Sequence, residues 1–138
     1  MRRWVTAMLS VLALLVLVAP PAQGGGRHDR TFVVAECGRL RTMPPLIEFG
    51  CDGGLYLDHI TWFRWHRWRA VGGGLFHMND CRPYCADGTY HTEWGYIWLR
   101  NRARCESSGR FAFQHERVRY VRRLLGRRGD GFSHIGCS

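Results

Sequence analysis

The signatures of several common enzyme classes are missing from this chain of 138 residues. It has no Gly-x-Ser-x-Gly elbow, no His-Glu-x-x-His motif and no glycine-rich phosphate loop. The motifs that usually identify a serine hydrolase, a zinc protease or a nucleotide-binding protein are therefore absent. The chain also has no internal repeat and no motif for reading a nucleic-acid sequence. The sequence alone therefore predicts no reaction and no particular ligand.

A membrane-spanning run is missing too. The longest apolar segment extends from Ala7 to Ala19 with only Ser10 interrupting it, whereas a membrane helix needs roughly 20 residues. Arginines precede this segment, and proline and small residues follow it, which is the layout of a helical secretory signal peptide. We expect cleavage after Gly24, with cleavage after Ala22 as a close alternative and an uncleaved N-terminal anchor as the competing interpretation.

The processed chain is expected to form one domain. Four segments are predicted: a signal peptide at 1–24, a flexible leader at 25–30, a β domain at 31–121 and a basic C-terminal tail at 122–138. A protein processed in this way keeps no transmembrane span, and we expect it to be extracellular or associated with the cell wall.

Lysine is absent, and all 20 basic residues are arginine. Loss of Arg2 and Arg3 with the signal peptide leaves 18 basic residues against 11 acidic ones, a net charge of about +7. A GC-rich genome accounts for the choice of arginine. The planar guanidinium also suits carboxylates, phosphates and aromatic faces, and a strongly basic surface favours anionic partners.

Cysteine, by contrast, is plentiful, and its count of six is even. In a small exported protein this predicts three disulfide bonds. The sequence does not choose among the possible pairings. The six residues are Cys37, Cys51, Cys81, Cys85, Cys105 and Cys137.

Short β-prone segments separated by glycine and proline turns run through the domain. We expect about six strands in an all-β, disulfide-stabilised sandwich or barrel. Residues 55–69 favour a strand over a helix because they are rich in aromatic and β-branched residues. The glycines at 72–74 are expected to break the strand pattern, and residues 100–110 to form a charged loop. The other predicted strands are 31–37, 46–51, 89–99, and 111–113 continued by 118–121.

The segment from Asn79 to Gly88, called the corner below, combines two cysteines with proline, glycine and Asn/Asp residues. This composition predicts a turn clamped by sulfur between two strands. The two cysteines either bond each other or pair outward, to Cys51 and to Cys37 or Cys105, and we favour the outward pairing because it joins the corner to neighbouring strands. A zinc site with nearby histidines is the alternative, although zinc sites use tighter cysteine spacing.

Several motifs flank the corner in a recognisable order. They are Ile47-x-Phe49-x-Cys51-x-Gly53, Leu57-x-x-Ile60-Thr61-Trp62-x-x-Trp65, Gly72-x-Gly74, Asn79-Asp80-Cys81-x-Pro83-x-Cys85-Ala86-x-Gly88, and Phe111 with Val118-x-Tyr120. This order resembles a group of small secreted actinobacterial proteins, from about Cys37 to Tyr120. The resemblance implies a secreted location and a β fold, and it implies no activity.

Tryptophans and arginines alternate in two of the predicted strands. One interpretation is an exposed platform that stacks on sugars or bases while arginines contact anionic groups. The other is that most of these tryptophans fill the core, with exceptions where a tryptophan lies opposite an arginine on an exposed strand face. The residues are Trp62, Trp65, Trp68, Trp94 and Trp98, with Arg64, Arg67, Arg69 and Arg100 among them.

Carboxylates offer a general acid and base in principle, but aspartates in turns usually cap backbone N–H groups. The candidates are Asp52, Asp58, Asp80, Asp87 and Glu93. No spacing among them matches a hydrolase signature, so we assign no catalytic residue.

The end of the chain carries the clearest electrostatic signal. We expect its arginines to contact anionic polymers or surfaces without sequence-specific readout of nucleic acid. The function expected is a secreted binding or structural module near an anionic cell envelope, without a cofactor or metal. A small wall-polymer hydrolase that uses carboxylates near the corner, and a secreted effector or inhibitor, are the alternatives. The arginines are Arg117, Arg119, Arg122, Arg123, Arg127 and Arg128.

Overall fold

The computed structural model describes residues 30–129 and 133–137, which form eight β-strands and no helix. The prediction of an all-β fold is confirmed, with more strands than the six expected. The predicted signal peptide and nearly all of the leader lie outside the described residues. Within those residues, no helix is long and apolar enough to cross a membrane. The strands are β1 (Thr31–Ala35), β2 (Arg39–Arg41), β3 (Ile47–Glu48), β4 (Leu55–Trp65), β5 (Arg69–Asn79), β6 (Tyr90–Arg104), β7 (Phe111–Tyr120) and β8 (Ser133–His134).

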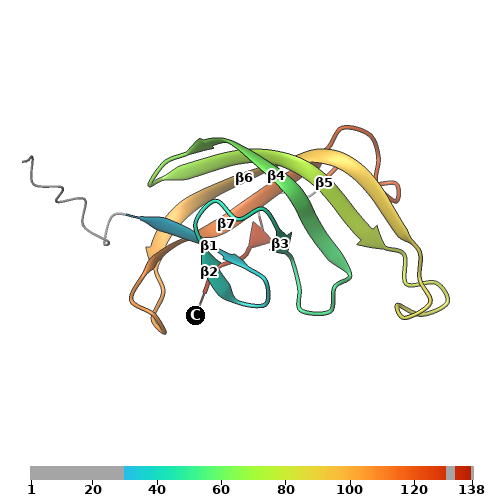
Figure 1. Ribbon diagram of the computed structural model, residues 1–138, viewed down its shortest axis with the longest axis horizontal. Coiled ribbons are helices and arrows are strands. Elements are labelled where there is room, and N and C mark those ends of the chain that lie inside the picture. The colour runs from blue at the N-terminus through green and yellow to red at the C-terminus, as the bar shows by residue number, and fades with distance from the viewer. Residues whose placement is uncertain (1–29, 130–132, 138) are drawn as a thin grey trace, which may run out of the picture.

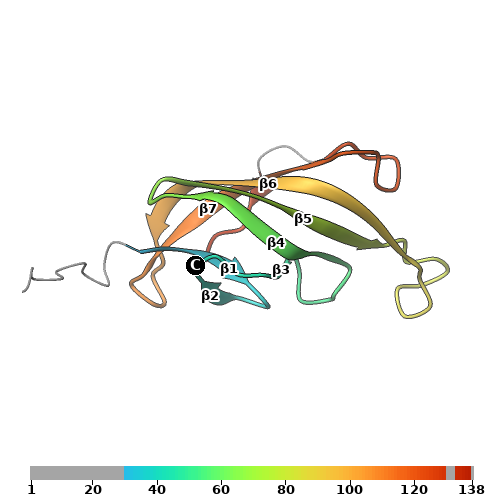
Figure 2. The same ribbon diagram turned by 45° about the horizontal axis from the view of Figure 1, so that its top comes forward.

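The strands form one curved sheet in the order β2-β1-β7-β6-β5-β4-β3, with β8 added to β7. The long strands β4 to β7 are antiparallel neighbours and make an arch, while β1 joins β7 in parallel. Figures 1 and 2 show β1, β2 and β3 lying in the hollow of this arch. Contacts between β1 and β3 bring the two ends of the sheet together. The sheet is thus half of a barrel, and it has a concave inner face and a convex outer face.

The core lies on the inner face of the arch. Its strand residues alternate with outward-facing ones, as a half-buried sheet requires. Trp62 and Trp65 close the core beside β1 and β3, and their indole N–H groups donate to the carbonyl oxygens of Pro44 and Thr31 at 2.9 and 3.2 Å. The core residues are Val33, Ala35, Ile47, Leu57, Ala70, Phe76, Ile97, Leu99, Phe113, Val118, Tyr120 and Leu124.

The three glycines of β5 do not break the strand pattern, so that prediction is wrong. β5 continues through Gly72, Gly73 and Gly74 because neighbouring groups cross closely over it. A Cβ on Gly72 would lie 2.8 Å from the ring of Trp62, and one on Gly74 would meet the backbone carbonyl of residue 58. Glycine here makes room for a bulged β4, whose register with β5 shifts twice.

One further sequence prediction is wrong in detail. The charged loop expected at 100–110 is strand as far as residue 104, because β6 continues to pair with β7 through Arg102, Ala103 and Arg104. The expected C-terminal tail includes β8, which pairs with β7. Polar sequences form strands in both places because partner strands supply the hydrogen bonds that propensity alone does not predict.

Candidate functional site

The corner is closed by its own disulfide, between Cys81 and Cys85, whose Cα atoms are 3.7 Å apart. The favoured outward pairing of these cysteines is therefore wrong. A second disulfide joins Cys105, in the turn after β6, to Cys137 near the C-terminus. It ties the end of the basic segment to the sheet.

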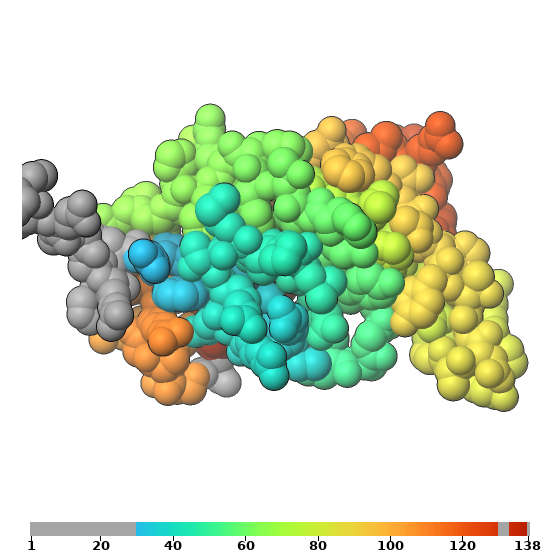
Figure 3. All heavy atoms as spheres, viewed as in Figure 1, coloured from blue at the N-terminus to red at the C-terminus, as the bar shows by residue number. Residues whose placement is uncertain are grey.

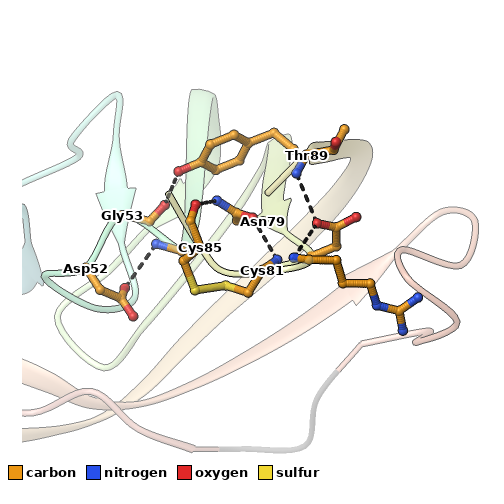
Figure 4. The surroundings of a disulfide bond; sticks show 10 residues. Asp52, Gly53, Asn79, Cys81, Cys85 and Thr89 are labelled. Atoms are coloured by element: carbon orange, nitrogen blue, oxygen red, sulfur yellow. Dashed lines mark hydrogen bonds between the residues drawn. A yellow bond between two sulfur atoms is a disulfide. The ribbon is translucent and has the colours of Figure 1, made fainter. Parts of the chain in front are cut away.

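Asn79 and Asp80 hold the corner in shape, and Figure 4 shows Asn79 between the two bonded cysteines and Thr89. Asn79 accepts from the N–H of Cys81 and donates to the carbonyl of Cys85, both at 2.8 Å. Asp80 accepts from the N–H groups of Arg82 and Thr89 at 3.1 and 3.0 Å. These caps bring the ends of the loop together, which is why its two cysteines find each other.

The remaining cysteines, Cys37 and Cys51, are exposed and unbonded. The Cys37 thiol also contacts a carboxylate oxygen of Glu48 at 3.5 Å. A hydrogen bond to Cys51, then desolvation and Glu48, raise the pKa of Cys37 to about 12. Two of the three predicted disulfides are formed, and the third, between Cys37 and Cys51, stays a prediction.

The outer face of the arch presents aromatic rings beside arginines, and is called the arginine–aromatic face below. Trp94, Tyr96 and Trp98 of β6 point outward, since the residues between them are buried. Tyr96 lies opposite Arg119 in the register, and Trp98 lies opposite Arg117. The expectation that most tryptophans fill the core therefore holds for Trp62 and Trp65, whereas Trp68 and Trp94 are exposed and Trp98 is half-buried.

A groove of about 480 Å³ lies on the same outer face, where the end of β4 and the start of β5 meet the middle of β6; we call it the aromatic groove. In the described part of the chain, its charged lining side chains are all arginine. The full lining is Phe63, Arg64, Arg69, Ala70, Val71, Trp98, Leu99 and Arg100.

Four of the six predicted polyanion-binding arginines surround a smaller depression of about 260 Å³, called the arginine hollow. They are Arg119, Arg122, Arg123 and Arg128. The segment is fixed to the sheet by backbone hydrogen bonds. The N–H of Tyr120 donates to the carbonyl of Arg128 at 2.9 Å, and the N–H of Val121 donates to the carbonyl of Trp94 at 2.8 Å. Arg117 lies on the arginine–aromatic face, and Arg127 lines a different pocket beside the corner.

That corner pocket has a volume of about 770 Å³ and contains Asp52, Asp80 and His91. Figure 3 shows the corner and the start of β6, in yellow, at one end of the molecule. His91 lies 3.2 Å from Asp80, and the pKa of Asp80 is lowered by the N–H of Thr89 first and by His91 second. Of the five candidate carboxylates, only Asp52 and Asp80 line this pocket, and Asp87 does not.

A second histidine and aspartate network crosses β4, β5 and β6 on the outer face. Asp58 contacts His59 at 2.9 Å and His77 at 3.1 Å, and His77 contacts the hydroxyl of Thr92 at 3.1 Å. Burial alone would raise the pKa of Asp58, but the two histidine contacts outweigh it and lower that pKa. No three His, Cys, Asp or Glu side chains of the described residues gather as ligands for a metal ion.

Sequence reasoning missed the aromatic groove and the histidine network because both depend on strand register. Phe63 belongs to the groove only because a bulge in β4 turns it outward over Gly73. Comparison with protein families, with curated proteins and with solved structures finds no match for this chain. The resemblance to small secreted actinobacterial proteins therefore stays a prediction.

Proposed function

We propose that this protein is a secreted binding module that attaches to anionic polymers of a cell envelope or of the extracellular space. The observation that carries the proposal is that Arg119 belongs to two features at once. It lies opposite Tyr96 on the arginine–aromatic face, and it lines the arginine hollow. A continuous basic surface thus extends from β7 into the segment that follows it.

A sheet favours this function because the backbone that carries the arginines needs no further ordering when a polymer binds. Guanidinium groups donate in a planar fork that matches carboxylate, sulfate and phosphate groups. Binding that releases counterions from a polyanion is strong in dilute salt and weakens as salt is added. Attachment through such a face needs no cofactor and no metal.

The direct test is co-sedimentation of the purified mature protein with cell-wall preparations and retention on heparin beads. We expect both in dilute buffer. The variant Arg119→Gln/Arg122→Gln/Arg123→Gln/Arg128→Gln should lose most of the bound fraction in both assays. Undiminished binding by this variant would refute the assignment of the site, and absence of binding by the wild type would refute the function.

A hydrolase is the second candidate, and the contact between His91 and Asp80 in the corner pocket favours it. A histidine oriented by a carboxylate is a general-base arrangement. Both carboxylates of the pocket also cap backbone N–H groups, however, which is sufficient reason for their positions. If a hydrolytic activity is detected, His91→Gln and Asp80→Asn should abolish it while Asp87→Asn preserves it; unchanged activity in the first two would remove this candidate.

A further inference from the structure

We propose that the aromatic groove binds a sugar ring that carries an anionic substituent, so that the polymer recognised by this protein is an acidic polysaccharide. The inference rests on the proposed function and narrows its ligand to one chemical class. It concerns Phe63, Val71 and Trp98 with Arg64, Arg69 and Arg100, none of which belongs to the arginine hollow.

The polar chemistry of the groove requires a ligand rich in hydrogen-bond acceptors. Arg64, Arg69 and Arg100 supply all of its charged side chains among the described residues. Guanidinium groups donate hydrogen bonds and accept none. The hydroxyl oxygens of a neutral sugar accept only ordinary hydrogen bonds from a guanidinium, whereas a carboxylate or sulfate accepts stronger, charge-assisted and bidentate ones. The arginines therefore select the anionic sugar.

The apolar part of the groove suits the C–H face of a pyranose. Phe63 is 57% exposed, although it is a large apolar side chain. Its ring lies over Gly73, where an added Cβ would come within 3.1 Å of it. Trp98 of β6 and Val71 of β5 lie opposite each other in the sheet and line the same groove as Phe63. The electron-rich face of an aromatic ring attracts weakly positive C–H groups, so a sugar gains stacking as well as charge pairing.

Tyr96, which lies beside the groove, forms no parallel ring pair with Phe63 or with Trp98 that would enclose a nucleic-acid base. Phe63 and Tyr96 are inclined at 50° with centroids 6.2 Å apart, and Tyr96 and Trp98 are inclined at 45° with centroids 6.0 Å apart. A planar base enclosed by two rings needs them parallel. A puckered ring that uses one aromatic face does not require a parallel pair.

The groove continues into the basic surface. Trp98 lines the groove, and its partner across the sheet is Arg117 on the arginine–aromatic face. A polymer with one sugar in the groove can therefore place its next charged units along Arg117 and Arg119. The groove would thus fix one sugar of the polymer, and the arginines of β7 would fix the direction in which the rest of the polymer runs.

The test measures the affinity of the mature protein for three probes in dilute buffer. These are oligogalacturonate, its methyl-esterified neutral form, and an oligothymidylate of equal charge. We expect tightest binding to oligogalacturonate and a loss of at least about tenfold on esterification. Phe63→Ala should lower the affinity for oligogalacturonate about fivefold and leave the affinity for oligothymidylate unchanged. Tyr84→Ala is the matched control, because Tyr84 is an equally exposed aromatic residue in the corner, at 60%.

Two results overturn the proposal. One is an unchanged oligogalacturonate affinity in both Phe63→Ala and Trp98→Leu; the other is equal or tighter binding of oligothymidylate by the wild type. In either case, binding that still depends on the arginine hollow leaves the proposed function standing. Failure of every anionic probe to bind refutes the proposed function itself, so the two failures are distinguishable.

Discussion

Trp98 of β6 lies directly opposite Arg117 of β7 on the outer face of the sheet. Directly opposed residues have Cβ atoms about 4.5–5.5 Å apart, within reach of side-chain contact. The next outward pair along the strands repeats the arrangement with Tyr96 and Arg119. Charge and aromatic surface are thus held together by the register of two long strands, and a flexible tail is not needed to present them.

Neutralising the two β7 arginines should weaken attachment to polyanions. We expect Arg117→Gln/Arg119→Gln to reduce affinity for oligogalacturonate about tenfold and to lower the slope of log affinity against log salt by about 2. Titration calorimetry at several salt concentrations measures both. Arg39→Gln/Arg41→Gln is the charge-matched control on β2, where both arginines lie near Glu36. An equal loss in the control would mean that net charge, and not this face, governs binding.

The two disulfides should differ in their contribution to stability. The bridge between Cys105 and Cys137 closes 32 residues of chain, whereas the one between Cys81 and Cys85 closes 4. Loop entropy predicts a loss of about 4 kcal/mol in the free energy of unfolding for the Cys105→Ser/Cys137→Ser variant and about 2 kcal/mol for Cys81→Ser/Cys85→Ser. Urea unfolding of each double variant checks this order, and the reverse order would refute it.

Cys37 and Cys51 should form a third disulfide when the protein is exported. Cys51 is the largest cause of the raised pKa of Cys37, so the two residues are neighbours. An oxidising compartment supplies a disulfide oxidant that accepts the two electrons while two protons leave. Thiol titration of denatured, secreted protein should then detect no free thiol. Two free thiols would contradict the prediction. Closing a loop of about 15 residues should add about 3 kcal/mol, measurable against Cys37→Ser/Cys51→Ser.

Adjacent glycines of β5 should respond differently to alanine. Gly74→Ala places a methyl group against the backbone of residue 58, which cannot move without disturbing β4. We expect a loss of about 1–3 kcal/mol in the free energy of unfolding. Gly73→Ala presses mainly on the exposed ring of Phe63, which can swing away. Urea midpoints should therefore fall less for Gly73→Ala, and equal losses would show that the backbone of β5 alone demands glycine.

The stability contribution of Asp58 should depend on pH. Its contacts with His59 and His77 lower its pKa below the ordinary value of 3.8. Between that value and the lower folded one, the unfolded chain binds more protons, so the stabilisation is complete at higher pH and is lost as pH falls through this window. The difference in unfolding free energy between wild type and Asp58→Asn should shrink from pH 6 to pH 3. A difference that grows on acidification would contradict this account.

Much of the fold follows from local sequence, since residues 55–65 and 90–99 are aromatic and β-branched enough to predict their strands. The course of β5 does not follow. Three consecutive glycines indicate a break unless it is known that Trp62 and Phe63 cross over them. That crossing depends on bulges in β4, which arise from pairing and not from any residue preference.

The candidate site was predictable only in part, because it too depends on strand pairing. The six C-terminal arginines stand out as a charge cluster, but sequence alone cannot divide them among the arginine–aromatic face, the arginine hollow and the corner pocket. The aromatic groove could not be predicted from the sequence, because Phe63 and Trp98 are 35 positions apart and only the folded sheet brings them together. The corner disulfide was the less favoured of two alternatives, because sequence alone did not show that the side-chain caps of Asn79 and Asp80 fold the loop back on itself.

The salt dependence of polyanion binding by the wild-type protein tests the central claim most directly. We measure the dissociation constant for oligogalacturonate from about 0.05 M to about 1 M salt. The account predicts a linear fall of log affinity with log salt and loss of binding near the upper end. Binding that persists undiminished at about 1 M salt, or that never occurs, would contradict the claim that the arginines of the outer face and hollow hold an anionic polymer.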